Sequence, residues 1–201
     1  MVDETSKDER YKARQQKVKD QVDARVEAAQ IEKGIFLIIT GNGKGKSTSG
    51  FGTIARAVGH GLKCGVGQFI KGTWDCGERK LLEQHDVDFA VMATGFTWDT
   101  QNKEADTAAA QATWAECKKM LSDDSYDVVL LDEMTYMVTY GYVELDEVIE
   151  AISNRPSMQS VIVTGRAAHR SLMDMADTVS EVRSIKHAFE SGIKARKGVD
   201  W

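Results

Sequence analysis

Cysteine is scarce in this 201-residue sequence, and no two cysteines form a Cys-x-x-Cys pair. Cys64, Cys76 and Cys117 are odd in number and widely spaced, which argues against a disulfide framework and against a zinc site. We therefore expect reduced thiols and a cytoplasmic protein. The sequence also lacks an apolar run of membrane length and the hydrophobic region of a signal peptide, so we expect no membrane partner.

An excess of positive charge and a cluster of histidines are lacking as well. The formal net charge is −5, which argues against a nucleic-acid partner because proteins that bind nucleic acid normally carry a basic surface. His60, His85, His169 and His187 are scattered, and their spacing indicates no metal cluster. We also find no Ser/His/Asp or Cys/His pattern that would indicate an activated side-chain nucleophile.

Apolar runs and predicted helices alternate from residue 34 onward. We predict strands over residues 35–39, 64–70, 87–93, 126–133, 160–164 and 179–185. We predict helices that end near residue 60, that pass through residues 81–82, and that cover residues 103–121, 145–152 and 169–175. Near-continuous apolar strands are typical of a mostly parallel sheet covered by helices on both faces. We therefore predict an α/β domain over residues 34–201.

Residues 1–33 differ from the rest because they are charged and nearly free of large apolar side chains. Tyr11, Val18, Val22, Val26 and Ala29 form a thin stripe, with spacings of four and three that fit one face of a helix. Such a helix would be marginally stable alone. Two interpretations stay open: a solvated helical arm, or an arm that docks its stripe on the domain or on a second subunit.

A glycine-rich loop separates the first predicted strand from the following helix. It consists of Gly41, Asn42, Gly43, Lys44, Gly45, Lys46, Ser47 and Thr48. In a loop of this kind the backbone N–H groups converge on an anion, and the helix directs its positive end toward the same point. Lys46 would add a full charge, and the Ser47 hydroxyl would ligate the Mg²⁺ that accompanies a nucleotide. The alternative is a simple turn between strand and helix.

The spacing of this loop departs from the usual pattern of Gly, four residues and Gly-Lys-Ser/Thr. Counting back from Gly45 puts Thr40 at the first glycine position, and Gly41 comes one residue late. We therefore expect a nucleotide to sit differently here than in an ordinary NTPase.

The strand predicted over residues 126–133 ends in two carboxylates, Asp132 and Glu133. Apolar residues followed by such a pair have the form of the second nucleotide motif of P-loop proteins, whose acidic group holds Mg²⁺ directly or through water. Helix-capping or surface carboxylates are the alternative. The sequence does not rank Asp132 against Glu133 as the metal ligand.

Three further residues follow predicted strands at the same edge of the sheet. Phe96 and Trp98 stand two apart in a polar loop, where they would form a local hydrophobic anchor or receive a large planar ligand. Arg166 follows the fifth strand, where it would bind phosphate or substrate, or form a surface salt bridge.

Several of these segments together resemble the bacterial P-loop type of corrinoid (cob(I)alamin) adenosyltransferase. The resemblance is carried by residues 41–48, Gln68-Phe69-Ile70-Lys71-Gly72, Met92-Ala93-Thr94-Gly95-Phe96-Thr97-Trp98, Leu131-Asp132-Glu133 and Val163-Thr164-Gly165-Arg166. It covers nearly the whole chain, and the aromatic loop makes it specific. One departure is Ser47, where the family often carries Thr, and the hydroxyl is retained.

The resemblance implies a RecA-like fold, a homodimer, and transfer of the 5′-deoxyadenosyl group of ATP to the cobalt of a reduced corrinoid, with release of triphosphate. It places the glycine-rich loop on the triphosphate of a nucleotide bound in reverse, and Ser47 with Glu133 near Mg²⁺. It places Phe96 and Trp98 against the lower face of the corrin ring. Together with Lys46, these two would carry catalysis. It also implies a reduced flavodoxin-type electron donor and an N-terminal helix that closes over a corrinoid site.

Two other functions remain compatible with the glycine-rich loop, residues 41–48, taken as a phosphate loop. One is a small-molecule kinase or ATPase that cleaves the γ-phosphate, and the other is a non-catalytic ATP-binding module whose arm recruits a partner. The products formed from ATP distinguish the three.

Overall fold

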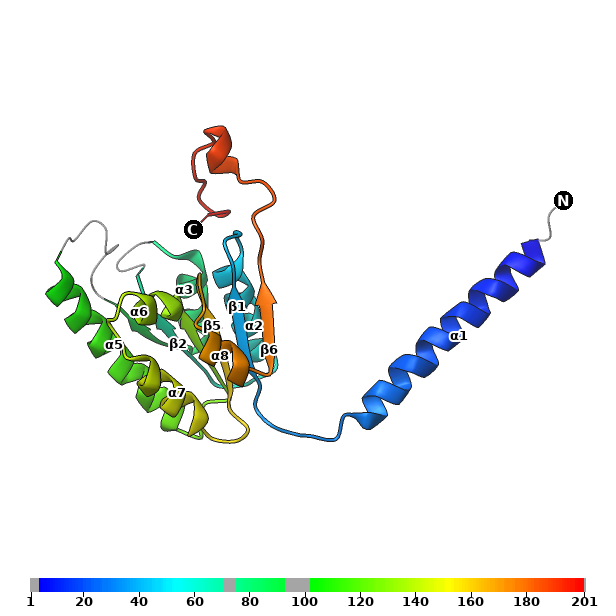
Figure 1. Ribbon diagram of the computed structural model, residues 1–201, viewed down its shortest axis with the longest axis horizontal. Coiled ribbons are helices and arrows are strands. Elements are labelled where there is room, and N and C mark those ends of the chain that lie inside the picture. The colour runs from blue at the N-terminus through cyan, green and yellow to red at the C-terminus, as the bar shows by residue number, and fades with distance from the viewer. Residues whose placement is uncertain (1–3, 71–74, 93–101, 201) are drawn as a thin grey trace. The chain divides into compact units, whose positions relative to one another are not determined.

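The computed structural model describes residues 4–70, 75–92 and 102–200 (Figure 1). The chain divides into two compact units, Met1–Glu32 and Lys33–Trp201. The first unit contains helix α1 (Glu4–Ala28), so the helix predicted from the thin stripe is present. Tyr11, Val18, Val22 and Val26 are exposed on it.

The second unit is built on a six-stranded parallel sheet. Its strands are β1 (Phe36–Thr40), β2 (Cys64–Gln68), β3 (Asp88–Val91), β4 (Val128–Asp132), β5 (Ser160–Thr164) and β6 (Thr178–Glu181). Their order is β3-β2-β4-β5-β1-β6, and every neighbouring pair is parallel. This confirms the predicted α/β class and the predicted parallel sheet.

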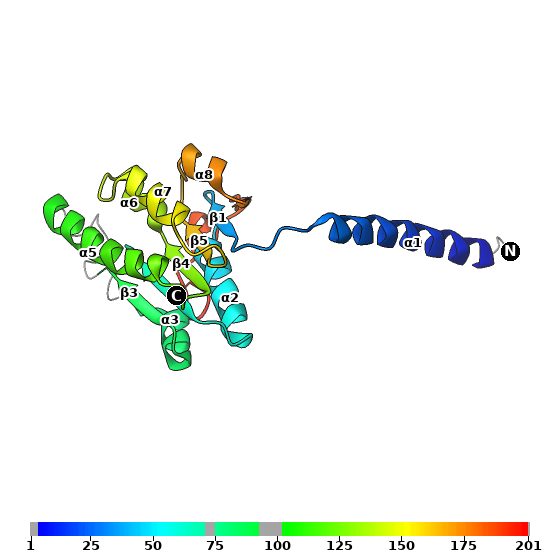
Figure 2. The ribbon, with the colours of Figure 1, turned by 90° about the horizontal axis from the view of Figure 1, so that it is seen from below.

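Helices cover both faces of this sheet (Figure 2). One face packs against α2 (Lys46–Gly59) and α3 (Gly77–Leu82), and the other against α5 (Lys103–Ser122), α6 (Met134–Thr139), α7 (Leu145–Ser153) and α8 (Arg170–Met175). Two short 3₁₀ helices, Glu83–His85 and Ala188–Ser191, complete the described elements.

Strand alternation divides the core between the two faces. In β4, Val129 and Leu131 join the cluster under α5, whereas Leu130 joins the cluster under α2. All three are fully buried, as expected for a strand covered on both sides. No helix in the described part of the chain is both long enough and apolar enough to cross a membrane.

Four predicted strands, β2, β3, β4 and β6, were too long at their carboxyl ends, and for three of them the structure shows a local difference. β2 ends at Gln68, two residues before Ile70, whose φ is 68°, and β4 ends at Asp132 because Glu133 has a φ of 62°. β6 ends at Glu181 rather than residue 185, and beyond it the Val182 carbonyl accepts a hydrogen bond from Gly43 N–H of the glycine-rich loop. The prediction also missed α6, a helix of six residues.

The three cysteines are free and buried. Burial raises the pKa of Cys117 to about 12 and that of Cys64 to about 11, so both thiols stay protonated at neutral pH. Both lie in the core clusters and serve packing.

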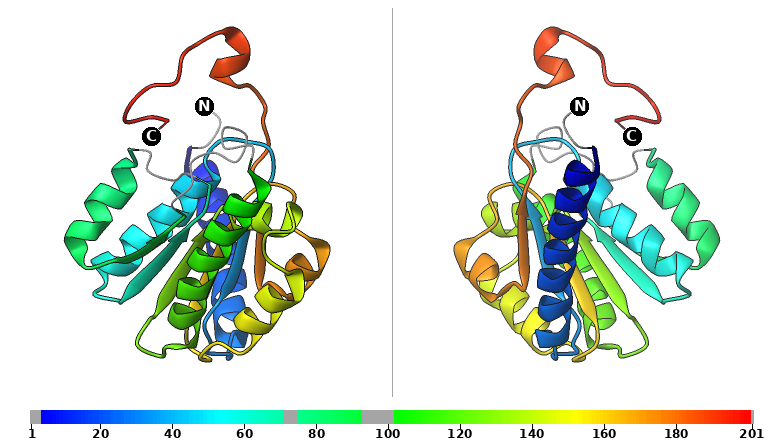
Figure 3. Two further views of the ribbon diagram at one scale, coloured as in Figure 1. Left: turned by 90° about the vertical axis from the view of Figure 1, so that its left-hand side faces the viewer. Right: turned by 90° about the vertical axis from the view of Figure 1, so that its right-hand side faces the viewer.

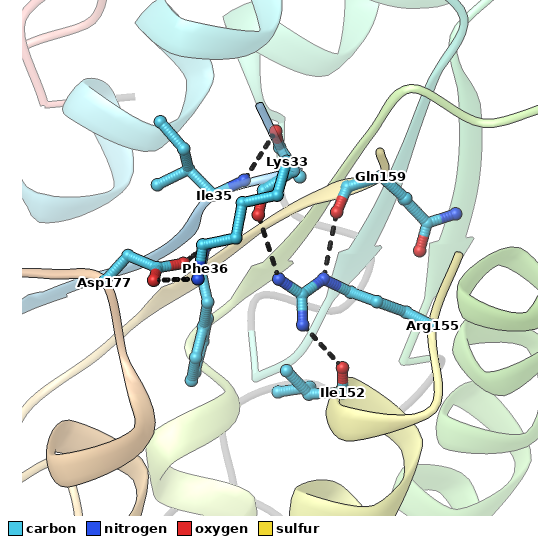
Figure 4. Close-up of polar contacts among 9 residues, drawn as sticks. Lys33, Ile35, Phe36, Ile152, Arg155, Gln159 and Asp177 are labelled. Atoms are coloured by element: carbon cyan, nitrogen blue, oxygen red, sulfur yellow. Dashed lines mark hydrogen bonds and ion pairs between the residues drawn. The ribbon is translucent and has the colours of Figure 1, made fainter. Parts of the chain in front are cut away.

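The amino-terminal edge of the sheet is held by a partly buried arginine. The Arg155 guanidinium donates hydrogen bonds to the carbonyls of Ile152 (2.6 Å), Gln159 (2.9 Å) and Gly34 (3.2 Å) (Figure 4). These bonds join the segment before β5 to the end of α7 and to the chain that enters β1. Nearby, the Asp177 carboxylate accepts from Phe36 N–H at 2.9 Å and from Lys33.

We predict that Arg155→Ala lowers the free energy of unfolding by about 2–3 kcal/mol, because it removes charged hydrogen bonds from partly buried carbonyls. Arg155→Lys should lose most of the same stability, since an ammonium group does not span three carbonyls. Urea unfolding measures the free energy of unfolding of both variants. Arg170→Ala is the control, because its ion pair with Asp174 is exposed and should contribute little. Stability of Arg155→Ala equal to that of the control would contradict the prediction.

Candidate functional site

A cavity of about 290 Å³ opens at the carboxyl ends of the parallel strands, where ligands bind in sheets of this kind. Half of its lining residues come from the glycine-rich loop, and the others come from the ends of other strands and from two distant segments. The lining residues are Asn42, Gly43, Lys44, Gly45, Lys46, Ser47, Thr48, Asp75, Cys76, Glu78, Glu133, Arg166, His187 and Asp200.

The glycine-rich loop follows β1, and α2 begins at Lys46. The chain after β6 packs closely on this loop: Gly43 N–H donates to the Val182 carbonyl at 2.7 Å. A Cβ atom at Gly41, whose φ is 103°, would lie 2.4 Å from the same carbonyl oxygen. Gly41 is therefore required by backbone packing, and it is the one predicted loop residue that is not part of the cavity wall.

Lys46 is buried inside the loop that it belongs to. Its Nζ donates a hydrogen bond to the Gly43 carbonyl at 2.8 Å, and only 8% of the residue is exposed. The loop thus holds a full positive charge beside the start of α2, whose helix dipole adds to it. Both features favour an anion in the cavity.

The structure places Asp132 and Glu133, which the sequence could not rank as metal ligands, in different surroundings. Asp132 is fully buried, and its Oδ1 accepts a hydrogen bond from the Thr164 hydroxyl at 2.7 Å. Glu133 lies in the turn after β4 and lines the cavity together with Ser47.

Arg166 also lines the cavity. Its carbonyl accepts a hydrogen bond from the Thr135 hydroxyl at 2.7 Å, which ties the turn after β5 to the first turn of α6. Phe96 and Trp98, the predicted aromatic pair, lie outside the described residues.

Five lining residues were not predicted from the sequence. Asp75 and Cys76 directly precede α3, Glu78 lies in its first turn, and His187 and Asp200 come from the carboxyl-terminal segment, residues 182–200. This segment, coloured orange to red, leaves β6 and passes over the carboxyl ends of the strands (Figure 3). These residues belong to no sequence motif, and only the path of the chain brings them to the loop.

Two ion pairs attach the carboxyl-terminal segment around the cavity. Lys44 pairs with Asp200 at 2.6 Å, and Lys197 pairs with Asp75 at 3.5 Å. The hydrogen bond from Lys44 lowers the pKa of Asp200, and the hydrogen bond from Lys80 lowers the pKa of Asp75. Both carboxylates are therefore ionised at neutral pH, and the Asp200 carboxylate faces Lys44 of the glycine-rich loop.

The oxygen donors in the cavity suit a hard cation. A carboxylate from Glu133 and a hydroxyl from Ser47 are ligands of the type that Mg²⁺ prefers, usually with phosphate oxygens and water completing its shell. Within the described ranges, no three His, Cys, Asp or Glu side chains group closely enough to hold a metal by themselves. The cavity therefore fits a metal that arrives with a polyphosphate.

Curated relatives match this chain over nearly its full length. It is 62% identical to the corrinoid adenosyltransferase of Escherichia coli (strain K12) and 63% identical to the corrinoid adenosyltransferase CobA of Salmonella typhimurium (strain LT2), in each case over 194 residues that make up 96% of this chain and 99% of the relative. It is 45% identical to the corrinoid adenosyltransferase of Pseudomonas aeruginosa over 203 residues that cover both chains fully.

Two family models match consecutive parts of the chain. Residues 1–26 match the model of the cob(I)alamin adenosyltransferase N terminal, and residues 32–201 match the model ATP:corrinoid adenosyltransferase BtuR/CobO/CobP. The second match includes the glycine-rich loop, Glu133 and Arg166, which all line the cavity. The chain belongs to the family of ATP:corrinoid adenosyltransferases.

Proposed function

We propose that this protein transfers the 5′-deoxyadenosyl group of ATP to Co(I) of a reduced corrinoid and releases triphosphate. The observation that carries the proposal is one cavity in which a phosphate loop faces Glu133, in a chain that matches the family over residues 32–201. The reaction needs no side-chain nucleophile because Co(I) itself attacks the 5′-carbon of the ribose. Accordingly, the tasks left to the protein are alignment of two substrates and stabilisation of the leaving group.

Leaving-group stabilisation falls to the phosphate loop, residues 41–48. Triphosphate gains negative charge as it departs, and preorganised donors lower the barrier most when they are aimed at such developing charge. Lys46 is held within the loop by its bond to Gly43, and Lys44 stands at the cavity wall. Since Lys44 already pairs with Asp200, we propose that Lys46 carries most of this stabilisation.

We propose that Ser47 and Glu133 hold Mg²⁺ together with the triphosphate. When bound, Mg²⁺ neutralises phosphate charge and polarises the leaving group. Glu133 is assigned this role ahead of Asp132, because Glu133 lines the cavity whereas Asp132 is buried against Thr164. Asp132 then stabilises the end of β4 through its hydrogen bond with the Thr164 hydroxyl.

For the corrinoid, the family resemblance assigns Phe96 and Trp98 to the lower face of the ring, and we extend the site to Arg166 because it lines the cavity. Apolar side chains on that face offer no lone pair to cobalt, so Co(II) would lose its lower ligand and become easier to reduce. Holding both substrates in line would supply about 7–11 kcal/mol of the barrier reduction.

The proposal extends to the organisation of the protein. We propose that residues 34–201 form the catalytic domain and that residues 1–33 form an arm that closes over a corrinoid site in a homodimer. The exposed stripe at Tyr11, Val18, Val22 and Val26 supports a docking role for the arm. We also propose a cytoplasmic location, which the free, buried cysteines support, and a reduced flavodoxin-type electron donor.

Product analysis tests the reaction. With MgATP and chemically reduced corrinoid, we expect triphosphate together with a photolabile cobalt–carbon bond. Formation of ADP would instead indicate a kinase or ATPase, and unchanged ATP would indicate a binding module.

We predict that Lys46→Ala lowers kcat/KM for MgATP by about 100-fold or more, the loss typical of removing one donor that stabilises transition-state charge. Initial rates of adenosylcobalamin formation at varied MgATP measure it. Lys119→Ala is the control, since this lysine is exposed on α5 and pairs only with Glu116 among the contacts described. ATP kinetics equal to those of the control would contradict the phosphate assignment.

We predict that Phe96→Ala and Trp98→Ala impair turnover from cob(II)alamin plus a reductant more than turnover from cob(I)alamin generated chemically. The reason is that both side chains act on the reduction step by occupying the lower face. Trp98→Phe, which keeps a flat apolar group, should retain more of the cob(II)alamin activity than Trp98→Ala. Equal losses of turnover with cob(II)alamin and with cob(I)alamin would contradict a role of these side chains in the reduction step.

A further inference from the structure

We propose that Thr164, at the end of β5, is the positioning residue that directs Glu133 into the cavity. The inference rests on the proposed role of Glu133 as a ligand of nucleotide-bound Mg²⁺. It gives a function to the segment Val163-Thr164-Gly165-Arg166, of which only Arg166 has been placed at the site so far.

The strand order puts Thr164 between the two nucleotide motifs. β5 pairs with β4 on one side and with β1 on the other, and Thr164 is the register partner of Ile39, two residues before the phosphate loop. Thr164 is fully buried. The Thr164 side chain therefore lies at the end of β5, between the ends of β1 and β4. These two ends lead into the phosphate loop and Glu133, respectively.

One hydroxyl group makes two hydrogen bonds at this point. Thr164 Oγ1 donates to Asp132 Oδ1 at 2.7 Å and accepts from the backbone N–H of Glu133 at 3.0 Å. A hydroxyl has one donor and two acceptor sites, so a single threonine satisfies both partners. The bond to a carboxylate is of the stronger, charge-assisted kind. Thr164 thus fixes both residues that follow the apolar part of β4.

The backbone of Glu133 requires such support. Its φ of 62° and ψ of 21° lie in the left-handed region, which is uncommon for a residue with a side chain and persists where surrounding contacts hold it. This conformation ends β4 and begins α6, and it places the Glu133 side chain at the cavity wall. The hydrogen bond from Glu133 N–H to Thr164 is made by the residue that carries the unusual conformation.

The next residue, Gly165, leaves the space that this arrangement needs. Its φ is 138°, and a Cβ atom there would lie 2.0 Å from Thr135 Oγ1 and 3.3 Å from Glu133 Oε2. Thr135 in turn donates to the Arg166 carbonyl at 2.7 Å. The turn after β5 therefore sets the positions of Glu133 and Arg166 at once.

A structural role for Thr164 would affect stability only, whereas a positioning role also affects metal use. The distinguishing quantity is the coupling between Mg²⁺ and ATP, defined as the ratio of the ATP dissociation constants in EDTA and in excess Mg²⁺. Isothermal titration calorimetry measures both constants without corrinoid, so the readout does not depend on turnover.

We predict that Thr164→Val lowers this ratio by about 10-fold or more, the usual effect of removing a group that orients a metal ligand. ATP binding in EDTA should change little. Thr164→Ser keeps the hydroxyl and should retain the wild-type ratio. Thr113→Val is the matched control, because this buried threonine on α5 donates its hydroxyl to the Ala109 carbonyl far from the phosphate loop along the chain. If Thr164→Val does not fold, Thr164→Cys carries the same expectation, since a thiol forms both bonds weakly.

Glu133→Gln separates this inference from the role on which it rests. Loss of coupling in Glu133→Gln and in Thr164→Val, with no further loss in the double variant, supports the inference, because Thr164 then acts through Glu133. Loss of coupling in Glu133→Gln with a wild-type ratio in Thr164→Val overturns the positioning role alone. Independent, additive losses overturn it as well. An unchanged ratio in Glu133→Gln overturns the assignment of Glu133 and the inference together.

Discussion

The adjacency of β4, β5 and β1 is the constraint on which the site depends. Parallel pairing brings the carboxyl ends of these strands to one edge, and each end delivers a different group: Glu133, Thr164 and the phosphate loop. The three groups lie more than thirty residues apart in the sequence. Backbone hydrogen bonds within the sheet therefore set the relative positions of these three groups, independently of contacts between the side chains of the site.

Backbone packing explains the form of the phosphate loop better than anion binding does by itself. The chain after β6 lies against Gly41 and Gly43, so closely that a side chain at Gly41 would meet the Val182 carbonyl. The loop is also one residue shorter than the usual pattern, counted from Gly45. Gly41 and Gly43 thus leave room for the neighbouring chain.

Charged groups of both signs line the cavity, and they come from elements that are distant in the sequence. Lys44 and Lys46 come from the phosphate loop, Glu133 follows β4, and Asp200 belongs to the carboxyl-terminal segment. The pair between Lys44 and Asp200 sits at the cavity wall and is partly exposed, so it contributes little to the stability of the fold. This ion pair places a carboxylate beside a cation of the loop at the cavity wall.

Most of the strands and helices, and the chemical groups at their ends, could be predicted from the sequence alone. Apolar runs predicted the six strands, glycine and lysine spacing predicted the phosphate loop, and the combined motifs identified the family. These features are local, because burial on both faces of a strand and the convergence of loop amides are each encoded within a few neighbouring residues.

Which of these groups meet depends on long-range packing, which the sequence patterns did not reveal. The tertiary structure separated Asp132 from Glu133 through a left-handed residue that propensity does not foresee, and it brought Asp75, His187 and Asp200 to the loop. The physical reason is that strand order and the path of the carboxyl-terminal chain depend on contacts between residues far apart in the sequence, whereas the patterns that a sequence displays report on near neighbours.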